Sequence, residues 1–350
     1  MFKTARLAVL ALAALIGLAF QANALPQAYE STLPNGLHVI MIPDNRAEMV
    51  ASYVIVNAAV RYETPEINGV THLLEHMLFN GTEKLTQEQL YAETDRLGAF
   101  NNAFTRKDFT AFMMLAPSYT FAKAFELQAD MLLHSTLLPE KLEKERGIII
   151  EEINQGMGSP DEAVADAMQR ILWNGMPYEM TVLGPKKVIS TISRDAVLKY
   201  YKSHYAPNGM TILLLGDFVP EEMMKLIQVN YGDAMPQSAP KADAAFRPAK
   251  PGMSVQYFSG ITPSISFAVL LPELSPEASV ALSLGEELLS ERLSKAFTER
   301  AGRDVEVSIS EDTYLEGGYL TGSISAQDEK EAKTFARTLP AALTAATSAP

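Results

Sequence analysis

The sequence predicts an α+β fold with two similar domains, each a mostly antiparallel β-sheet packed with helices. Apolar residues recur at helical and at strand spacing in clusters, without the strict alternation that builds parallel sheets. The composition is that of a globular chain, with 47% hydrophobic and 20% charged residues. A stretch rich in proline, alanine and lysine, 236–251, reads as a linker between a first domain, 25–235, and a second, 252–350.

The N-terminal segment, 1–24, predicts a cleaved signal peptide. Lys3 and Arg6 precede an apolar run, Leu7–Phe20, that is too short to span a bilayer, and a small-x-small site follows it at 22–24. An uncleaved anchor is the alternative. Cysteine is absent, which excludes a lipid-anchored cysteine and disulfides. We therefore expect export from a bacterial cytoplasm to the periplasm, with no stable membrane anchor.

Elements of the first domain follow from hydrophobic periodicity and from turn residues. Strands are predicted at 31–43, as a pair around Pro34-Asn35-Gly36, at 50–60, as a second pair within 100–115, and at 210–215. Helices are predicted between the breaks at 68–69 and 80–81, and at 87–97, 119–135, 140–155, 161–173 and 194–204.

The second domain begins with a similar choice of elements. The sequence predicts a strand at 264–271, a long helix at 276–300 and two more strands after it. The tail, "AALTAATSAP", gives no pattern that closes the fold. We expect this domain to be incomplete.

The short helix near residue 70 carries the strongest chemical signal. His72 and His76 are four residues apart and therefore project from one face, close enough to share a cation. Neutral imidazole suits zinc, and a catalytic zinc site needs three protein ligands. Glu75 flanks the same face and can take a proton from a metal-activated water, then deliver it to the leaving amine. The alternative is a pair of ordinary histidines on an amphipathic helix.

A third metal ligand is expected on a neighbouring element. In the helix at 140–155, three acids stand among apolar residues, where an unpaired carboxylate would be costly and a cation would compensate it. They are Glu145, Glu151 and Glu152, and the spacing does not choose among them. A solvated charged helix is the alternative.

The formal net charge of −13 argues against nucleic-acid binding, which needs a basic surface.

Several segments together resemble the pitrilysin-type (M16) zinc peptidases, including the bacterial members related to processing peptidases. "HLLEHMLFNGT" resembles the family's "HFLEHMLFKGT", and the "NGL" strand and the "ER…EEI" helix are present. The resemblance implies a zinc-dependent endopeptidase that hydrolyses unfolded peptides or short polypeptides. It implies one zinc ion per chain, held by His72, His76 and Glu152, with Glu145 supporting them and Glu75 as general base.

The strand "GAFNNAFT", 98–105, is similar to the family strand that holds an extended substrate. The resemblance assigns this role to Asn102 and Ala103. Main-chain hydrogen bonds from an edge strand would bind an unfolded peptide with little regard for its side chains.

The second domain departs from the family pattern. Complete members carry an arginine and a tyrosine seven residues apart, and Thr298 and Val305 occupy those places when aligned on Gly302. Arg300 and Arg303 are close but out of register. We therefore expect a hetero-oligomer with an M16-like subunit that supplies the missing pair. The alternatives are a non-catalytic scaffold or assembly subunit and a periplasmic peptide-binding module.

Overall fold

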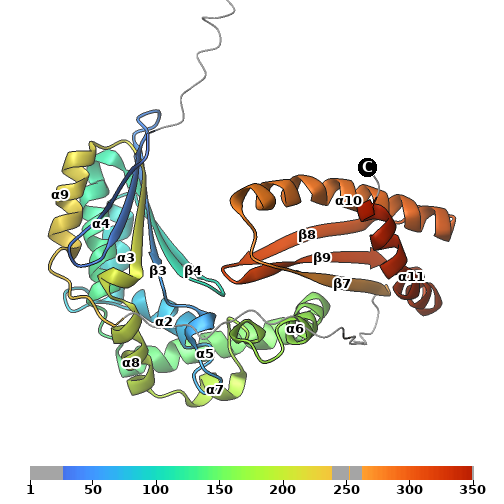
Figure 1. Cartoon of the computed structure of the whole chain (residues 1–350). Helices are drawn as coiled ribbons and strands as arrows, with labels where there is room; N and C mark the ends of the chain where they lie inside the picture. The colour runs from blue at the N-terminus through green and yellow to red at the C-terminus, as the bar shows by residue number, and fades with distance from the viewer. Residues whose placement is uncertain (1–26, 239–251, 253–261, 349–350) are drawn as a thin grey trace, which may run out of the picture.

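The computed structural model describes residues 27–238, 252 and 262–348 (Figure 1). The expected signal peptide and most of the expected linker, from residue 239 onward, lie outside this range. Within it, every helix is too short or too polar to cross a membrane. The described chain is a mixed α+β structure with two separate sheets, which confirms the predicted fold class.

The larger sheet is built from the first part of the chain. Its strand order is β1-β2-β6-β3-β5-β4. β2 and β6 pair in parallel and all other neighbours are antiparallel, as expected. The strands are β1 (Tyr29–Thr32), β2 (His38–Pro43), β3 (Met49–Val56), β4 (Phe100–Thr105), β5 (Thr110–Pro117) and β6 (Met210–Gly216). β4 is therefore an edge strand.

Helices cover one face of this sheet and continue below it (Figure 1). They are α2 (Val70–Leu78), α3 (Gln87–Arg96), α4 (Ser118–Leu133), α5 (Pro139–Met157), α6 (Pro160–Leu172), α7 (Lys186–Thr191), α8 (Arg194–His204) and α9 (Pro220–Tyr231), with short 3-10 turns at Val60–Tyr62, Pro177–Glu179 and Pro207–Gly209. Alternate β3 residues, such as Val54, are fully buried under them. The sequence did not predict α7 or α9, although α9 begins with the proline and acidic first turn typical of a helix start.

The smaller sheet has the order β7-β9-β8 and is antiparallel throughout. Its elements are β7 (Ser264–Leu271), α10 (Pro276–Ala301), β8 (Val307–Tyr314), β9 (Gly317–Ser325) and α11 (Glu329–Ser348). Phe297 of α10 and Phe335 of α11 meet at 4.9 Å between ring centroids in its core. The sequence missed α11, because an internal proline, Pro340, and an alanine- and threonine-rich tail weaken its pattern.

The tip of the β8–β9 hairpin contacts the first domain. The Arg61 guanidinium pairs with Asp108 at 3.1 Å and with Glu316 of the hairpin. The backbone N–H of Leu315 also donates to Asp108, at 2.9 Å. An aromatic cluster lies beside these charges and joins Trp173 and Tyr178 to Tyr314 and Tyr319. The two domains therefore meet near the turn between β4 and β5.

Candidate metal centre

The position of α2 is set by the packing at its ends and along its apolar side. Gly69 precedes the helix with φ at +94°, and a Cβ there would lie 2.5 Å from the Leu183 carbonyl oxygen. Glycine is needed for both reasons. The apolar residues of α2, among them Leu73, Leu74, Met77 and Leu78, are buried. This packing leaves the polar face of the helix toward α5 and β4.

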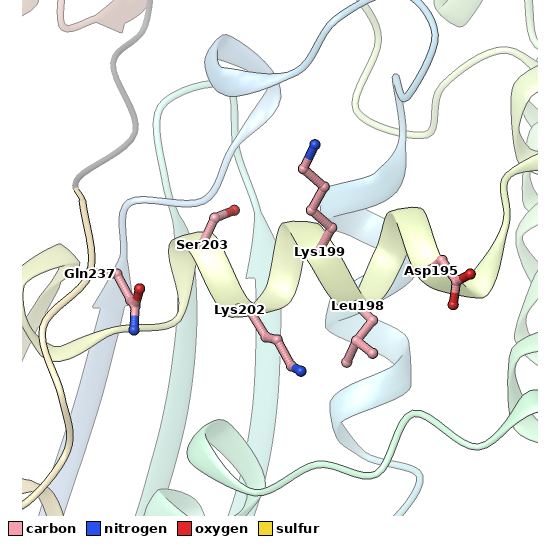
Figure 2. A pocket seen from close by; sticks show the side chains of 6 residues that line it. All are labelled: Asp195, Leu198, Lys199, Lys202, Ser203 and Gln237. Atoms are coloured by element: carbon pink, nitrogen blue, oxygen red, sulfur yellow. The ribbon is translucent and has the colours of Figure 1, made fainter.

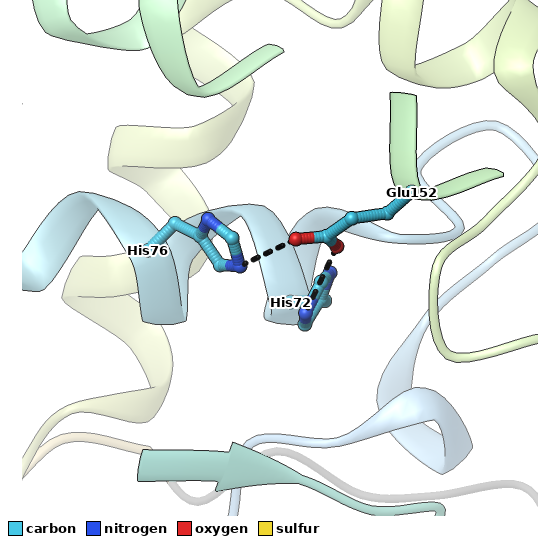
Figure 3. A group of neighbouring side chains, drawn as sticks. All are labelled: His72, His76 and Glu152. Atoms are coloured by element: carbon cyan, nitrogen blue, oxygen red, sulfur yellow. Dashed lines mark ion pairs between the residues drawn. The ribbon is translucent and has the colours of Figure 1, made fainter. Parts of the chain in front are cut away.

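The structure brings His72, His76 and Glu152 together (Figure 3). Nε2 of each imidazole lies 3.9 Å from an oxygen of Glu152, and the three ligand atoms are within 4.8 Å of one another. Bonds of roughly 2.0–2.2 Å to one zinc ion allow two ligand atoms to be at most about 4.4 Å apart. The set therefore fits a single zinc ion after small side-chain rotations.

The three acids that the sequence could not separate have different surroundings. Glu152 faces the imidazole pair, while Glu145 is buried behind it, with Oε2 3.1 Å from His76 Nδ1. Glu151 is exposed and accepts a hydrogen bond from Asn154. Asn80, a residue not predicted to belong to the site, donates to Glu145 at 3.0 Å. Glu145 therefore fixes the ring of His76 with Nε2 directed at Glu152.

The two histidines have opposite electrostatic surroundings. Burial, helped by the charge of His76, lowers the pKa of His72 to about 4. Burial alone would also lower the pKa of His76, but the hydrogen bond to Glu145 and the charges of Glu152, Glu145 and Glu75 outweigh it and raise that pKa. Neutral His72 could bind a cation directly, whereas a proton would compete with a metal ion for His76.

Glu75 lies on the β4 side of α2. The residue is 8% exposed, and its carboxylate accepts a hydrogen bond from Thr105, the last residue of β4. Burial raises the pKa of Glu75, and the hydrogen bond from Thr105 opposes that rise. Thr105 is the last residue of the strand motif GAFNNAFT, in which roles were predicted for Asn102 and Ala103 alone. The threonine hydroxyl at the end of the motif is the sole sequence signal for this contact with Glu75.

β4 places Asn102 and Ala103 on the outer edge of the sheet, next to α2. The Ala103 N–H donates to the Asn102 side chain at 2.9 Å. Ala103 stands opposite Phe112 of β5, three places along from the hydrogen bond that the Arg106 N–H donates to Phe109, and hydrogen-bonded pairs alternate along an antiparallel ladder. That N–H is therefore directed to the open edge, where an added strand could accept it.

The second-domain positions expected to lack arginine and tyrosine serve the local fold. Thr298 and Val305 are joined by hydrogen bonds between the threonine hydroxyl and the valine backbone, and Val305 is buried. The nearby Arg303 pairs with Glu331 of α11, at 2.5 Å. Neither Thr298 nor Val305 offers the chemistry of the family's arginine and tyrosine.

A separate surface pocket lies along α8 and adds nothing to the metal group. Figure 2 shows its lining, Asp195, Leu198, Lys199, Lys202, Ser203 and Gln237. The polar ends of these side chains point in different directions and do not converge on a common point. We assign no function to this pocket.

Family models match most of the chain. The model of insulinase (peptidase family M16) matches residues 38–186, and the model of the peptidase M16 inactive domain matches residues 191–343. The chain belongs to peptidase family M16. The second model begins before β6, a strand of the first sheet, so the two matches do not coincide with the two sheets.

Curated relatives include peptidases of organelles and bacteria. The chain is 31% identical over 209 residues to mitochondrial-processing peptidase subunit beta of Caenorhabditis elegans, covering 59% of this chain and 45% of that protein. It is 29% identical over 201 residues to a Bacillus subtilis protein named as the uncharacterized zinc protease YmxG, covering 57% of this chain and 49% of that protein. The chain spans about half the length of the curated relatives it matches.

Solved structures share the fold. A protease from Helicobacter pylori superposes with a TM-score of 0.80 at 20% identity, over 91% of this chain and 79% of that one. The periplasmic protease PqqL from Escherichia coli gives a TM-score of 0.71 at 18% identity, over 86% of this chain and 35% of that one. At these identities the likeness establishes the fold alone.

Proposed function

We propose that the chain is an exported, zinc-dependent endopeptidase that hydrolyses unfolded peptides or short polypeptides. The observation that carries the proposal is the convergence of two imidazoles and one carboxylate, His72, His76 and Glu152, beside a buried acid, Glu75. Membership of family M16 and the named zinc protease among the relatives support the same reaction class.

A bound zinc ion would supply Lewis acidity, polarising the scissile carbonyl and making a nearby water easier to deprotonate. His72, His76 and Glu152 would hold it, with Glu145 orienting His76. Glu75 would accept the proton of the attacking water and later deliver it to the leaving amine. The raised pKa of Glu75, caused mainly by burial, suits a group that must both take and release a proton.

β4 would hold the substrate in an extended form. A peptide added to its open edge would pair with the outward backbone groups of Ala103, beside the Asn102 side chain and next to the helix that carries Glu75. An unfolded segment offers its main-chain N–H and C=O groups freely for such pairing, which is why we assign unfolded polypeptides as the substrate class.

The Glu75→Gln variant tests the mechanism. The amide keeps the shape and cannot act as a base, so we expect normal zinc content and a loss of turnover of about 10²–10⁴-fold. Glu93→Gln, at the end of α3, is the control and should cleave at the wild-type rate. Wild-type cleavage by Glu75→Gln would refute the assignment.

We also propose that full activity needs an M16-like partner subunit. Thr298 and Val305 cannot replace an arginine and a tyrosine, and several relatives are named as the beta subunit of a processing peptidase. The mature chain alone should cleave slowly and gain activity when a partner co-purified from the periplasm is added. Full activity of the isolated monomer would contradict this.

A scaffold or assembly subunit is the second candidate function. It is favoured by Thr298 and Val305, which stand where the family has its arginine and tyrosine. It requires no bound metal. Stoichiometric zinc in the protein isolated from the periplasmic fraction would reject it, and recovery of the protein only from the cytoplasm would reject the proposed location.

A further inference from the structure

We propose that Glu63 is a positioning residue that orients His72 by anchoring the first turn of α2. The proposal deepens the zinc-peptidase function proposed above and rests on it. Glu63 lies outside α2, just after the 3-10 turn Val60–Tyr62, and its side chain is buried at 6% exposure.

Within the described part of the chain, the Glu63 carboxylate accepts hydrogen bonds only from residues at or just before the start of α2. Oε2 accepts from the Gly69 N–H at 2.8 Å and from the Asn68 side chain at 2.7 Å. Oε1 accepts from the Thr71 N–H at 2.9 Å. The first N–H groups of a helix lack partners within the helix, and Gly69 has no side chain to cap them. Glu63 takes the place of that cap.

This anchor matters for His72 in particular. His76 is oriented by Glu145, whereas His72 Nδ1 is buried without a hydrogen-bond partner among the residues the structure describes. The His72 ring has the edge of the His76 ring at 4.6 Å between centroids, and with no hydrogen bond at Nδ1 its direction depends strongly on the backbone that carries it. Thr71, the residue directly before it, is held on both sides, since its N–H donates to Glu63 and its hydroxyl contacts Tyr200 at 2.7 Å.

A carboxylate suits this task better than an amide. Two oxygens accept three N–H donors here, and the partial positive charge at the helix N-terminus favours the negative group. In Glu63→Gln, one oxygen becomes an NH₂ group, which must face an N–H donor at Gly69 or Thr71. The first turn of α2 would shift, and His72 would move with it.

The test measures metal binding by Glu63→Gln, with Glu66→Gln as the matched control on the exposed part of the same loop. Zinc affinity is measured by competition with a chromophoric chelator, and coordination geometry by the visible spectrum of the Co²⁺-loaded protein. We expect about tenfold weaker zinc binding and an altered Co²⁺ spectrum in Glu63→Gln, with an unchanged far-UV spectrum of the metal-free protein. The control should match wild type.

Glu63→Asp keeps the charge on a shorter side chain that cannot reach both sets of donors, and an intermediate loss of affinity is expected. Equal zinc affinity and Co²⁺ spectra in Glu63→Gln and Glu66→Gln would overturn the proposal. Failure of both Glu63 variants to fold without metal would also overturn it, because the residue would then serve the fold as a whole. Absence of zinc binding in wild type would instead reject the proposed function.

Discussion

Thr105 donates a hydrogen bond of 2.5 Å from its hydroxyl to Oε2 of Glu75. This contact joins the last residue of the edge strand β4 to the buried acid of α2. The strand proposed to hold the substrate and the group proposed to move the proton are thus fixed to each other. A change at Thr105 should affect the chemical step more than substrate binding.

Thr105→Val tests that relationship. Valine keeps the shape and removes the donor, so Glu75 loses a hydrogen bond to its charged form. We expect kcat to fall about tenfold with little change in KM and with unchanged zinc content. Thr120→Val, which removes a half-buried hydroxyl that donates to the Leu97 carbonyl, is the control. Equal rates in the two variants would show that the contact does not orient Glu75.

Glu145→Ala should weaken zinc binding without removing a ligand. The change deletes the partner of His76 Nδ1 and leaves the imidazole free to rotate, so we expect zinc affinity to fall about 10–100-fold. Equilibrium competition with a chelator measures it. Glu143→Ala, on the exposed side of the same helix, should bind zinc as wild type does. A Glu145→Ala protein with wild-type affinity would remove Glu145 from the site.

His72 and His76, the two proposed zinc ligands, should titrate apart in the metal-free protein. The pKa of His72 is lowered to about 4 by burial, and the pKa of His76 is raised above 6.5 mainly by Glu145 against the effect of burial. At pH 6, His72 should be neutral and His76 protonated. Imidazole NMR signals can resolve this in a chain with five histidines. Joint titration of both rings near pH 6.5 would contradict the described surroundings.

The same shifts predict how stability depends on pH. Between pH 6.5 and 4 the unfolded chain protonates His72 and the folded chain does not, so the contribution of His72 to the free energy of unfolding falls as the pH is lowered. His76 has the opposite sign, because its contribution is present below pH 6.5 and is lost as the pH rises through its raised pKa. Chemical unfolding of wild type and of His72→Ala at pH 7 and pH 4.5 isolates the contribution of His72 to the free energy of unfolding.

Much of this fold could be predicted from periodicity alone. β3 alternates buried and half-buried residues, and α2 keeps its apolar side at helical spacing, so both were predictable. α11 was not, since Pro340 and a run of alanine and threonine hide its buried side. Spacing also could not choose among Glu145, Glu151 and Glu152. Which acid faces the imidazoles depends on how α5 is rotated against α2, and only tertiary packing sets that rotation.

Long-range contacts were the least predictable part of the site. Glu63 and Asn80 are polar residues in the segments that connect helices, where such residues are common for local reasons. Their roles come from what folds against them, namely the start of α2 for Glu63 and Glu145 of α5 for Asn80. The sequence carries no signal for these pairings beyond the residue types.

Zinc stoichiometry in Glu152→Gln and Glu151→Gln, compared with wild type, tests the central claim most directly. The neighbouring acids share one helix, but only Glu152 faces the imidazole pair. Elemental analysis after dialysis against dilute zinc should give about one zinc per chain for wild type and Glu151→Gln, and a small fraction of that for Glu152→Gln. Equal zinc content in both variants would contradict the claim that His72, His76 and Glu152 form the metal centre.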